Sequence, residues 1–278
     1  MTIDRDTYAG LAADVLEPQR DQPPLVLLHG LTFDRSTWRP VLRELELLGR
    51  GAIAFDLPGH GQSLDLDSYR LSSVVPRIHA AIEAAGLREP VLVGHSVSAV
   101  IATAYAAVHR TGGVVNVAQS LYVTPFASFI QAHADEIQGP GFCDVWRELS
   151  ATMDAHLLPS EAQRMLAAAS RPRQEVAAGY WSDLLAHTIA DLAVWSAGRL
   201  GAVRAARVPY RLIVGSEPDP EYRRWLGSQL PHASLTVLPR SGHFPQVAHP
   251  RRFARSLLDF TDRARASSPD LDRAGAVI

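Results

Sequence analysis

Ser96 is the residue whose sequence surroundings point most directly to covalent chemistry. It lies at the centre of GHSVS, residues 94–98. A serine hydroxyl is a weak nucleophile unless it is exposed, aimed and next to a base. A sharp turn from a strand into a helix exposes and aims the hydroxyl, but it crowds the backbone, so small residues must stand two positions before and after the serine. Gly94 meets this need, whereas Ser98 stands where the commoner pattern has glycine.

The segments on both sides of this pentapeptide bear on whether it is a chance match. Residues 90–93 (PVLV) form a short apolar run that predicts a buried strand. Residues 97–108 are rich in alanine and other small residues, which is typical of a helix packed closely on a sheet. The alternative is that Ser96 only caps a helix. The abrupt change from strand to helix favours a nucleophile.

The elements that must position Ser96 alternate along the first half of the chain. Further strands are predicted at 24–28, 52–55 and 114–123. Helices are predicted from Ser36, as the N-cap, to about Gly49, and at 71–85. Strands that alternate with amphipathic helices predict βαβ units around a parallel sheet.

The alternation of strands and helices stops near Thr124-Pro125. From 126 to about 207 only helical segments are expected, whereas strands return at 210–214 and 234–238, before a last helix at 250–263. A helical insertion in a sheet protein is expected to cover the sheet as a cap. The predicted organisation is therefore a core in two parts, 1–124 and 208–263, with a cap at 125–207 and a flexible tail at 264–278.

Composition narrows the classes of function. The chain has 278 residues and a formal charge of -2, so nucleic acid is not expected as a partner. All 27 basic residues are arginine, which excludes lysine Schiff bases and Walker-type phosphate loops. With one cysteine, no signal-peptide pattern and no apolar run of membrane-spanning length, we expect a cytoplasmic protein that does not bind membranes. A small-molecule substrate is the expected partner, with the chain a monomer or a homodimer.

Five motifs carry a resemblance to a known family. They are LLHGLT (27–32), DLPGHGQS (56–63), VGHSVSA (93–99), LIVGSEPD (212–219) and SGHFPQVAHP (241–250). In this order, and over about residues 7–263, they resemble the α/β-hydrolase fold superfamily, in its branch of capped esterases and C–C hydrolases. The resemblance implies an α/β fold: a mostly parallel central sheet flanked by helices, with a helical cap inserted after the sixth strand.

The resemblance also implies a catalytic base and its order in the chain, which is Ser, acid, His. Among the 11 histidines, His243 fits best because it follows a predicted strand and lies in a loop after Ser241-Gly242. Its rival, His249, directly precedes Pro250 and is expected to lead into the last helix. Three other histidines, His29, His60 and His95, are expected to be structural.

The acid is expected just after the strand at 210–214. Asp219 is the first candidate and Glu217 the second. The family's other position for the acid follows the strand predicted to end at Val123, where Thr124 and Pro125 offer no carboxylate. Asp56 is expected to be a turn residue.

The oxyanion hole and the pocket follow from the same resemblance. The backbone N–H groups of Leu31 and Val97 would stabilise the oxyanion. Phe126, Trp146 and Trp181 are the expected pocket residues, although each could simply join the cap to the sheet. Arg147, Arg171 and Arg173 could bind an anion or lie on solvated surface. The sequence shows no metal or nucleotide motif, so no cofactor is expected.

These observations predict a carboxylesterase-like serine hydrolase. It would cleave a small, largely hydrophobic carboxylic ester, lactone or thioester through an acyl-enzyme, with the pKa of His243 expected near ~6–7. Three alternatives use the same triad: C–C bond hydrolysis, perhydrolysis and a lyase reaction. A non-catalytic small-molecule receptor is the alternative from another class.

Overall fold

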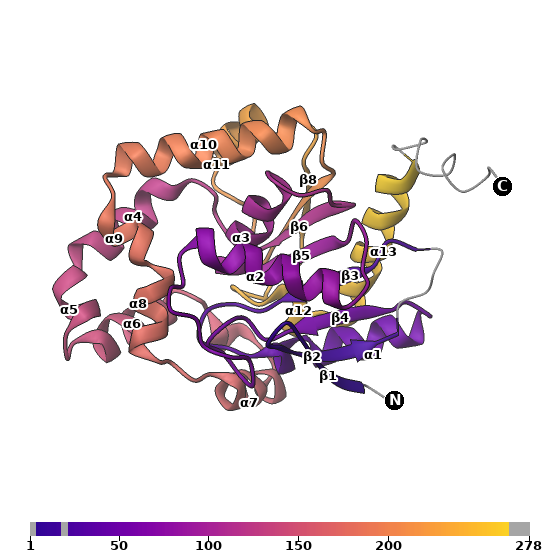
Figure 1. The fold of residues 1–278 in the computed structure, drawn as a ribbon, viewed down its shortest axis with the longest axis horizontal. Coiled ribbons are helices and arrows are strands. Elements are labelled where there is room, and N and C mark those ends of the chain that lie inside the picture. Colours follow the sequence, from indigo (N-terminus) through magenta and orange to yellow (C-terminus); the bar gives the residue numbers. More distant parts are fainter. Residues whose placement is uncertain (1–3, 18–21, 267–278) are drawn as a thin grey trace.

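A single eight-stranded sheet organises the molecule (Figure 1). The computed structural model describes residues 4–17 and 22–266. The strand order is β1-β2-β4-β3-β5-β6-β7-β8; β1 and β2 pair antiparallel, β2 and β4 also pair antiparallel, and every other neighbouring pair is parallel. The strands are β1 (Asp4–Tyr8), β2 (Leu11–Leu16), β3 (Leu25–Leu28), β4 (Ala52–Phe55), β5 (Val91–His95), β6 (Gly113–Val117), β7 (Tyr210–Val214) and β8 (Ser234–Val237).

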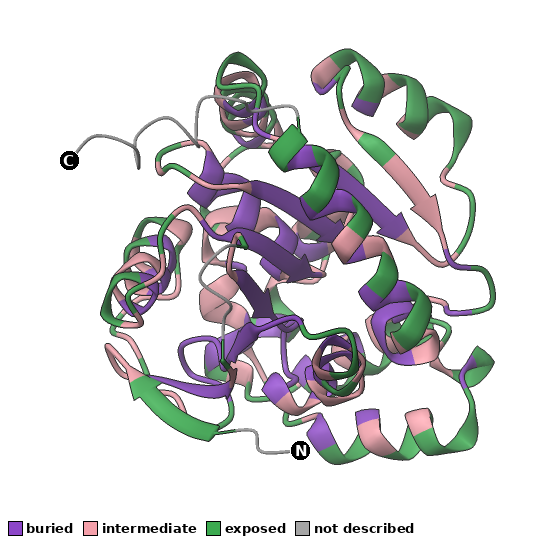
Figure 2. Cartoon of the chain, turned by 90° about the vertical axis from the view of Figure 1, so that its right-hand side faces the viewer, coloured by how far each residue is buried: buried purple, intermediate pink, exposed green. Residues whose placement is uncertain are grey.

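Helices cover both faces of the sheet, and Figure 2 shows the buried strands between them. One face packs against α1 (Arg39–Leu47) and α13 (Pro250–Ala266). The other packs against α2 (Leu71–Ala84), α3 (Val97–Ala106) and α11 (Pro220–Gln229). The central strands are apolar and buried on both sides, as expected for parallel strands covered by helices.

The cap lies between β6 and β7 and is helical throughout. Its α-helices are α4 (Val123–Ala132), α5 (Ala134–Gln138), α6 (Phe142–Ala151), α7 (Ser160–Ala169), α8 (Gln174–Tyr180), α9 (Ser182–Ala186) and α10 (Ile189–Ala205). Two 3-10 turns, Arg35–Trp38 before α1 and Ala155–Leu157 in the cap, and the short α12 (Pro245–Ala248) complete the described elements. The α/β-hydrolase fold with a helical insertion after the sixth strand is confirmed.

Three expectations about the elements were wrong, and two strands were not predicted. The strand predicted at 114–123 ends at Val117, because Ala118 has a positive φ of 59° and leaves the sheet. The N-terminal strands β1 and β2 were not foreseen. Asp34, and not Ser36, caps the turn before α1, since its side chain accepts a hydrogen bond from the Ser36 amide. The last helix continues to Ala266, so only residues 267–278 of the predicted tail lie outside the described residues.

Candidate active site

Ser96 occupies a strained turn between β5 and α3. Its backbone has φ 55° and ψ -129°, values that a non-glycine residue adopts only where the surrounding structure enforces them. The Ser96 amide donates to the carbonyl oxygen of Val117 at the end of β6, 2.9 Å away. A Cβ on Gly94 would lie 2.2 Å from the Ser98 carbonyl oxygen, so no larger residue fits there. The geometry is that of a nucleophile turn at the carboxyl edge of the sheet.

Ser98, the irregular residue of the pentapeptide, is fully buried in α3. Its hydroxyl donates a hydrogen bond to the carbonyl oxygen of His29, the first residue of the loop after β3. A glycine at this position could not make that bond. The departure from the usual glycine therefore adds a link between the turn at Ser96 and the loop that follows β3.

The loop after β3 carries the predicted oxyanion donor Leu31, is called the oxyanion loop below, and lies close to Ser96. A Cβ on Gly30 would lie 3.2 Å from the Ser96 Cβ, so the two segments are in contact. Within the described residues, the amides of Leu31 and Val97 donate no hydrogen bond to another residue. Both predicted oxyanion donors thus have an amide available for a ligand.

Two buried histidines hold this loop in place. His29 Nε2 accepts from the Leu57 amide at 2.9 Å, and His60 Nε2 accepts from the Thr32 amide at 3.1 Å. The structural roles foreseen for His29 and His60 agree with these contacts. Because the Nε2 of each ring accepts a hydrogen bond from a backbone amide, that nitrogen carries no proton.

His243 lies in the loop between β8 and α12, next to His95. The two imidazole centroids are 4.9 Å apart, and His95 Nε2 is 2.8 Å from the His243 carbonyl oxygen. The His243 amide donates to the Met153 carbonyl oxygen of the cap at 2.9 Å. His243 Nε2 is buried and has no hydrogen-bond partner among the described residues. Burial lowers the pKa of His243 to about 4, below the 6–7 expected from the sequence.

His249, the rival base, has a structural position. Its Nε2 lies 2.7 Å from the Pro239 carbonyl oxygen, and its own carbonyl oxygen accepts from the Phe253 amide of α13. It therefore anchors the start of the last helix, as the sequence indicated.

The structure places the acid candidates less favourably than the sequence suggested. Asp219 is exposed and caps α11, where its Oδ1 accepts from the amides of Glu221 (2.7 Å) and Tyr222 (3.4 Å). Glu217 is exposed and pairs with Arg223 at 3.3 Å. In the part of the chain that the structure describes, neither carboxylate forms a hydrogen bond or ion pair with His243. The residues after the true end of β6, 118–120, are Ala, Gln and Ser, so no carboxylate is available there either.

The cap places an aromatic cluster over the oxyanion loop. Phe126, Trp146 and Trp181 belong to one apolar cluster with Leu31 and Val97. The Trp181 ring centroid is 6.2 Å from that of Phe126 and 6.3 Å from that of Trp146. All three predicted pocket residues are thus brought together with both predicted oxyanion residues.

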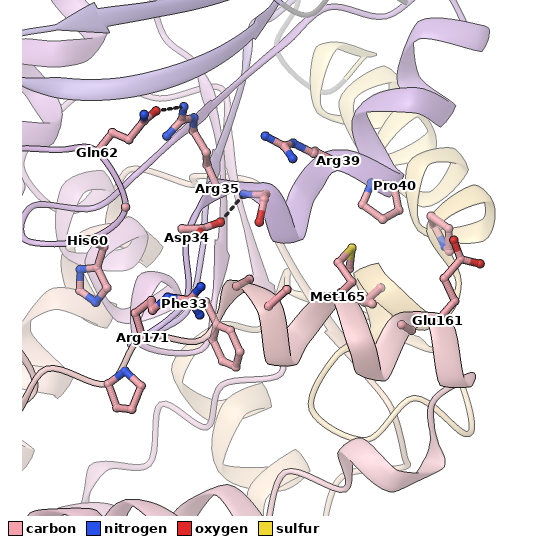
Figure 3. A pocket seen from close by; sticks show the side chains of 18 of the residues that line it. Phe33, Asp34, Arg35, Arg39, Pro40, His60, Gln62, Glu161, Met165 and Arg171 are labelled. Carbon is pink, nitrogen blue, oxygen red and sulfur yellow. Dashed lines mark hydrogen bonds between the residues drawn. The ribbon is translucent and has the colours of Figure 1, made fainter.

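An arginine-rich groove of about 1250 Å³ lies beside this cluster, between the segment that leads into α1 and helix α7 (Figure 3). Neither Ser96 nor His243 lines it. Its charged lining residues are Arg5, Asp34, Arg35, Arg39, Arg43, Glu161, Arg171 and Arg173. Arg171 makes no ion pair within the described residues, and its amide donates to the Thr32 carbonyl oxygen at 2.7 Å, which joins the groove to the oxyanion loop. Arg173, by contrast, pairs with Asp65 and Glu175.

Arg35 was not singled out from the sequence. It is buried, donates from Nε to Asp14 at 2.8 Å, and pairs through another nitrogen with Asp56. Asp56 also accepts the Arg35 and Gln62 amides. Asp56 therefore stabilises the DLPGHGQS turn, as expected of a turn residue. Arg35 links this turn to β2 through Asp14.

Within residues 4–17 and 22–266, no three His, Cys, Asp or Glu side chains group as metal ligands. None of the helices described here is both long and apolar enough to span a bilayer.

Comparison with known proteins places the chain in a family. The profile of the alpha/beta hydrolase family matches residues 25–256, and the chain belongs to this family of enzymes. A 2-succinyl-6-hydroxy-2,4-cyclohexadiene-1-carboxylate synthase from Yersinia pseudotuberculosis is 27% identical over 268 residues, which cover 90% of this chain and 92% of the relative.

Solved structures support the fold. A thermophilic esterase from Thermogutta terrifontis superposes with a TM-score of 0.75 at 19% identity, over 94% of this chain and 99% of the esterase. A bromoperoxidase from Bacillus anthracis gives a TM-score of 0.71 at 15% identity, over 93% of this chain and 100% of that protein.

Proposed function

We propose that the protein is a carboxylesterase-like serine hydrolase. Its substrate would be a small, largely hydrophobic carboxylic ester, lactone or thioester. Ser96 attacks the carbonyl carbon, His243 takes the hydroxyl proton and returns it to the leaving group, and Asp219 orients and stabilises the imidazole. The N–H groups of Leu31 and Val97 stabilise the charge on the carbonyl oxygen.

The observation that carries this proposal is the backbone of Ser96. Its φ of 55° at the end of β5 stores strain that a purely structural serine does not need. The available amides of Leu31 and Val97 lie in the two segments that meet at this serine. A strained serine and two unused amides together are the arrangement that acyl transfer requires.

Asp219 can serve as the acid without leaving its helix cap. Both amides at the start of α11 bind its Oδ1, and its Oδ2 accepts no hydrogen bond from any described residue. For Asp219 to act as the acid, the β7–α11 loop would have to move so that Oδ2 reaches the His243 imidazole. Glu217 remains the second candidate, and its ion pair with Arg223 is exposed and therefore weak.

Hydrolysis of p-nitrophenyl esters of increasing chain length, together with a lactone and a thioester, tests the proposal. Ser96→Ala should lower kcat by at least about 10³-fold, because the nucleophile is lost. Asp219→Asn and Glu217→Gln identify the acid, which is the residue whose loss lowers kcat more. If Ser96→Ala hydrolyses the esters at the wild-type rate, the proposal is rejected.

A lyase reaction on the same residues is the second candidate. The observation that favours it is the relative named a synthase, since the product in its name carries a succinyl group and a carboxylate, both anionic. The groove with Arg171 would suit such a substrate, because guanidinium groups bind carboxylates. Here His243 and Ser96 would move a proton and no acyl-enzyme would form.

Succinate and glutarate separate the two candidates. Under the lyase proposal they should inhibit competitively, and Arg171→Gln should weaken that inhibition more than Arg147→Gln, since Arg147 lies outside the groove and pairs with Asp144 on the surface. Equal inhibition of wild type and Arg171→Gln would reject the anionic site.

A further inference from the structure

We infer that His95 and Ser98 are positioning residues, which fix the loop of the base and the oxyanion loop to the turn at Ser96. Each side chain donates a hydrogen bond to the backbone carbonyl of a histidine far away in the sequence. The inference rests on the proposed function, because it concerns the same nucleophile. It assigns a role to His95 and Ser98, two residues of GHSVS that the reaction itself does not use.

Ser98 fixes the oxyanion loop. It is fully buried on α3, and its hydroxyl donates to the carbonyl oxygen of His29, 69 residues earlier. His29 directly precedes Gly30 and Leu31, and a Cβ on Gly30 would lie 3.2 Å from the Ser96 Cβ, so this loop passes close to the nucleophile. A change in the position of the His29 carbonyl therefore moves the Leu31 amide relative to the nucleophile.

His95 fixes the loop of the base. It is 1% exposed, and its Nε2 donates to the carbonyl oxygen of His243, 148 residues later. A carbonyl oxygen can only accept, so the proton of the His95 imidazole is on Nε2 and its Nδ1 carries none. That Nδ1 is buried against Gly30 without a partner among the described residues. Burial, and secondly the neighbouring His243, lower the pKa of His95, which keeps this ring neutral.

The hydrogen bonds of His95 and Ser98 both start from residues of the same rigid segment, the turn at Ser96. The turn at Ser96 is held between β5, β6 and α3, whereas the two loops reach it from distant parts of the chain. Displacement of a catalytic group by about 1 Å can cost about 10²-fold in rate. His95, one residue before the nucleophile, and Ser98, two residues after it, therefore position the His243 loop and the oxyanion loop relative to Ser96.

Two substitutions at Ser98 separate the hydrogen bond from the size of the side chain. Ser98→Ala keeps the Cβ and removes the donor, and Ser98→Gly restores the residue that is usual at this position. Both should lower kcat for ester hydrolysis about 10-fold to 100-fold, with KM within about twofold of wild type, because only transition-state binding weakens. The exposed Ser228, which donates to the Trp225 carbonyl oxygen, gives a matched control in Ser228→Ala.

Two substitutions at His95 test the second bond. His95→Gln can still donate from its amide nitrogen, whereas His95→Met fills a similar volume and cannot donate. His95→Met should lower kcat about 10-fold to 100-fold and shift the acid limb of the pH–rate profile, because the base is misplaced, and His95→Gln should recover most of the rate. The Ser98 variants should leave the pH profile unchanged.

Rates are counted per folded protein, with the folded fraction measured by circular dichroism, so that partial unfolding does not lower kcat. The inference is overturned if Ser98→Gly is as active as wild type, or if His95→Met and His95→Gln behave alike. Ser96→Ala separates it from the proposed function. If that variant is inactive while the Ser98 and His95 variants are unaffected, only the positioning roles fail; if it remains active, the proposed function fails.

Discussion

Acid should destabilise this protein well above the pH at which its carboxylates titrate. His29 and His60 are buried, at 0% and 7% exposed, and burial lowers their pKa values to about 4 and about 3. In the unfolded chain a histidine has a pKa of about 6.5, so the unfolded state binds more protons below that pH. The stability that these neutral rings contribute is fully present above pH 6.5. It is lost as the pH falls from 6.5 toward the folded-state pKa, about 4 for His29 and about 3 for His60.

The size of the loss follows from these values. At pH 5 each histidine is almost fully protonated in the unfolded chain but neutral in the folded protein. This difference lowers the free energy of unfolding by about 2 kcal/mol for each ring. Together they remove about 4 kcal/mol from a total stability of about 5–15 kcal/mol. The structure shows why the rings resist protonation, since the Nε2 of each accepts an amide hydrogen bond that a proton would displace.

Urea unfolding followed by circular dichroism at pH 8, 7, 6 and 5 measures this effect. His60→Gln should reduce the loss between pH 8 and pH 5 by about 2 kcal/mol, because glutamine can accept the Thr32 amide and does not titrate. His156→Gln, at an exposed histidine of the cap, should leave the loss unchanged. A free energy of unfolding that is constant from pH 8 to pH 5, or equal slopes for wild type and His60→Gln, would refute the reasoning.

Three further predictions concern the turn, the buried ion pairs and the cap. Gly94→Ala should abolish ester hydrolysis and lower the melting temperature, since its Cβ would lie 2.2 Å from the Ser98 carbonyl oxygen; retained kcat would contradict this. Arg35→Leu should cost about 3–5 kcal/mol in urea unfolding, because it leaves the buried Asp56 without its guanidinium partner and Asp14 with Arg39 alone, and a loss below about 1 kcal/mol would argue against the network. Trp181→Ala should shift the preferred p-nitrophenyl ester toward longer acyl chains by enlarging the pocket, and an unchanged chain-length profile would place Trp181 outside it.

The sequence predicted the turn at Ser96 because the local requirements of that turn are strict. An apolar strand, Gly94 two residues before the serine and a helix of small residues after it are all visible in one segment. The loops after parallel strands meet at the same edge of a sheet, so the resemblance to a known family also predicts that Leu31 and His243 lie near the nucleophile.

Features that depend on distant partners could not be predicted in this way. Nothing near Ser98 shows that its hydroxyl meets the His29 carbonyl, because the bond spans 69 residues. The strand β2 was missed since Asp14 interrupts its apolar pattern, and that buried carboxylate pairs with Arg35 and Arg39, which are distant in the sequence.

The position of Asp219 illustrates a signal that was present but not used. Asp followed by Pro is typical of a helix start, with the aspartate as N-cap and the proline in the first turn. The same residue was assigned as the acid from the resemblance alone. The structure places its Oδ1 in the cap, which leaves only Oδ2 for His243.

Labelling with a fluorophosphonate tests the central claim, that Ser96 is an activated nucleophile, most directly. Intact mass and peptide mapping of the treated protein at pH 8 should show a single adduct, on Ser96. His243→Ala should abolish the adduct, and Ser228→Ala should leave it unchanged. No adduct on the folded wild-type protein, or one that maps to another residue, would contradict the account.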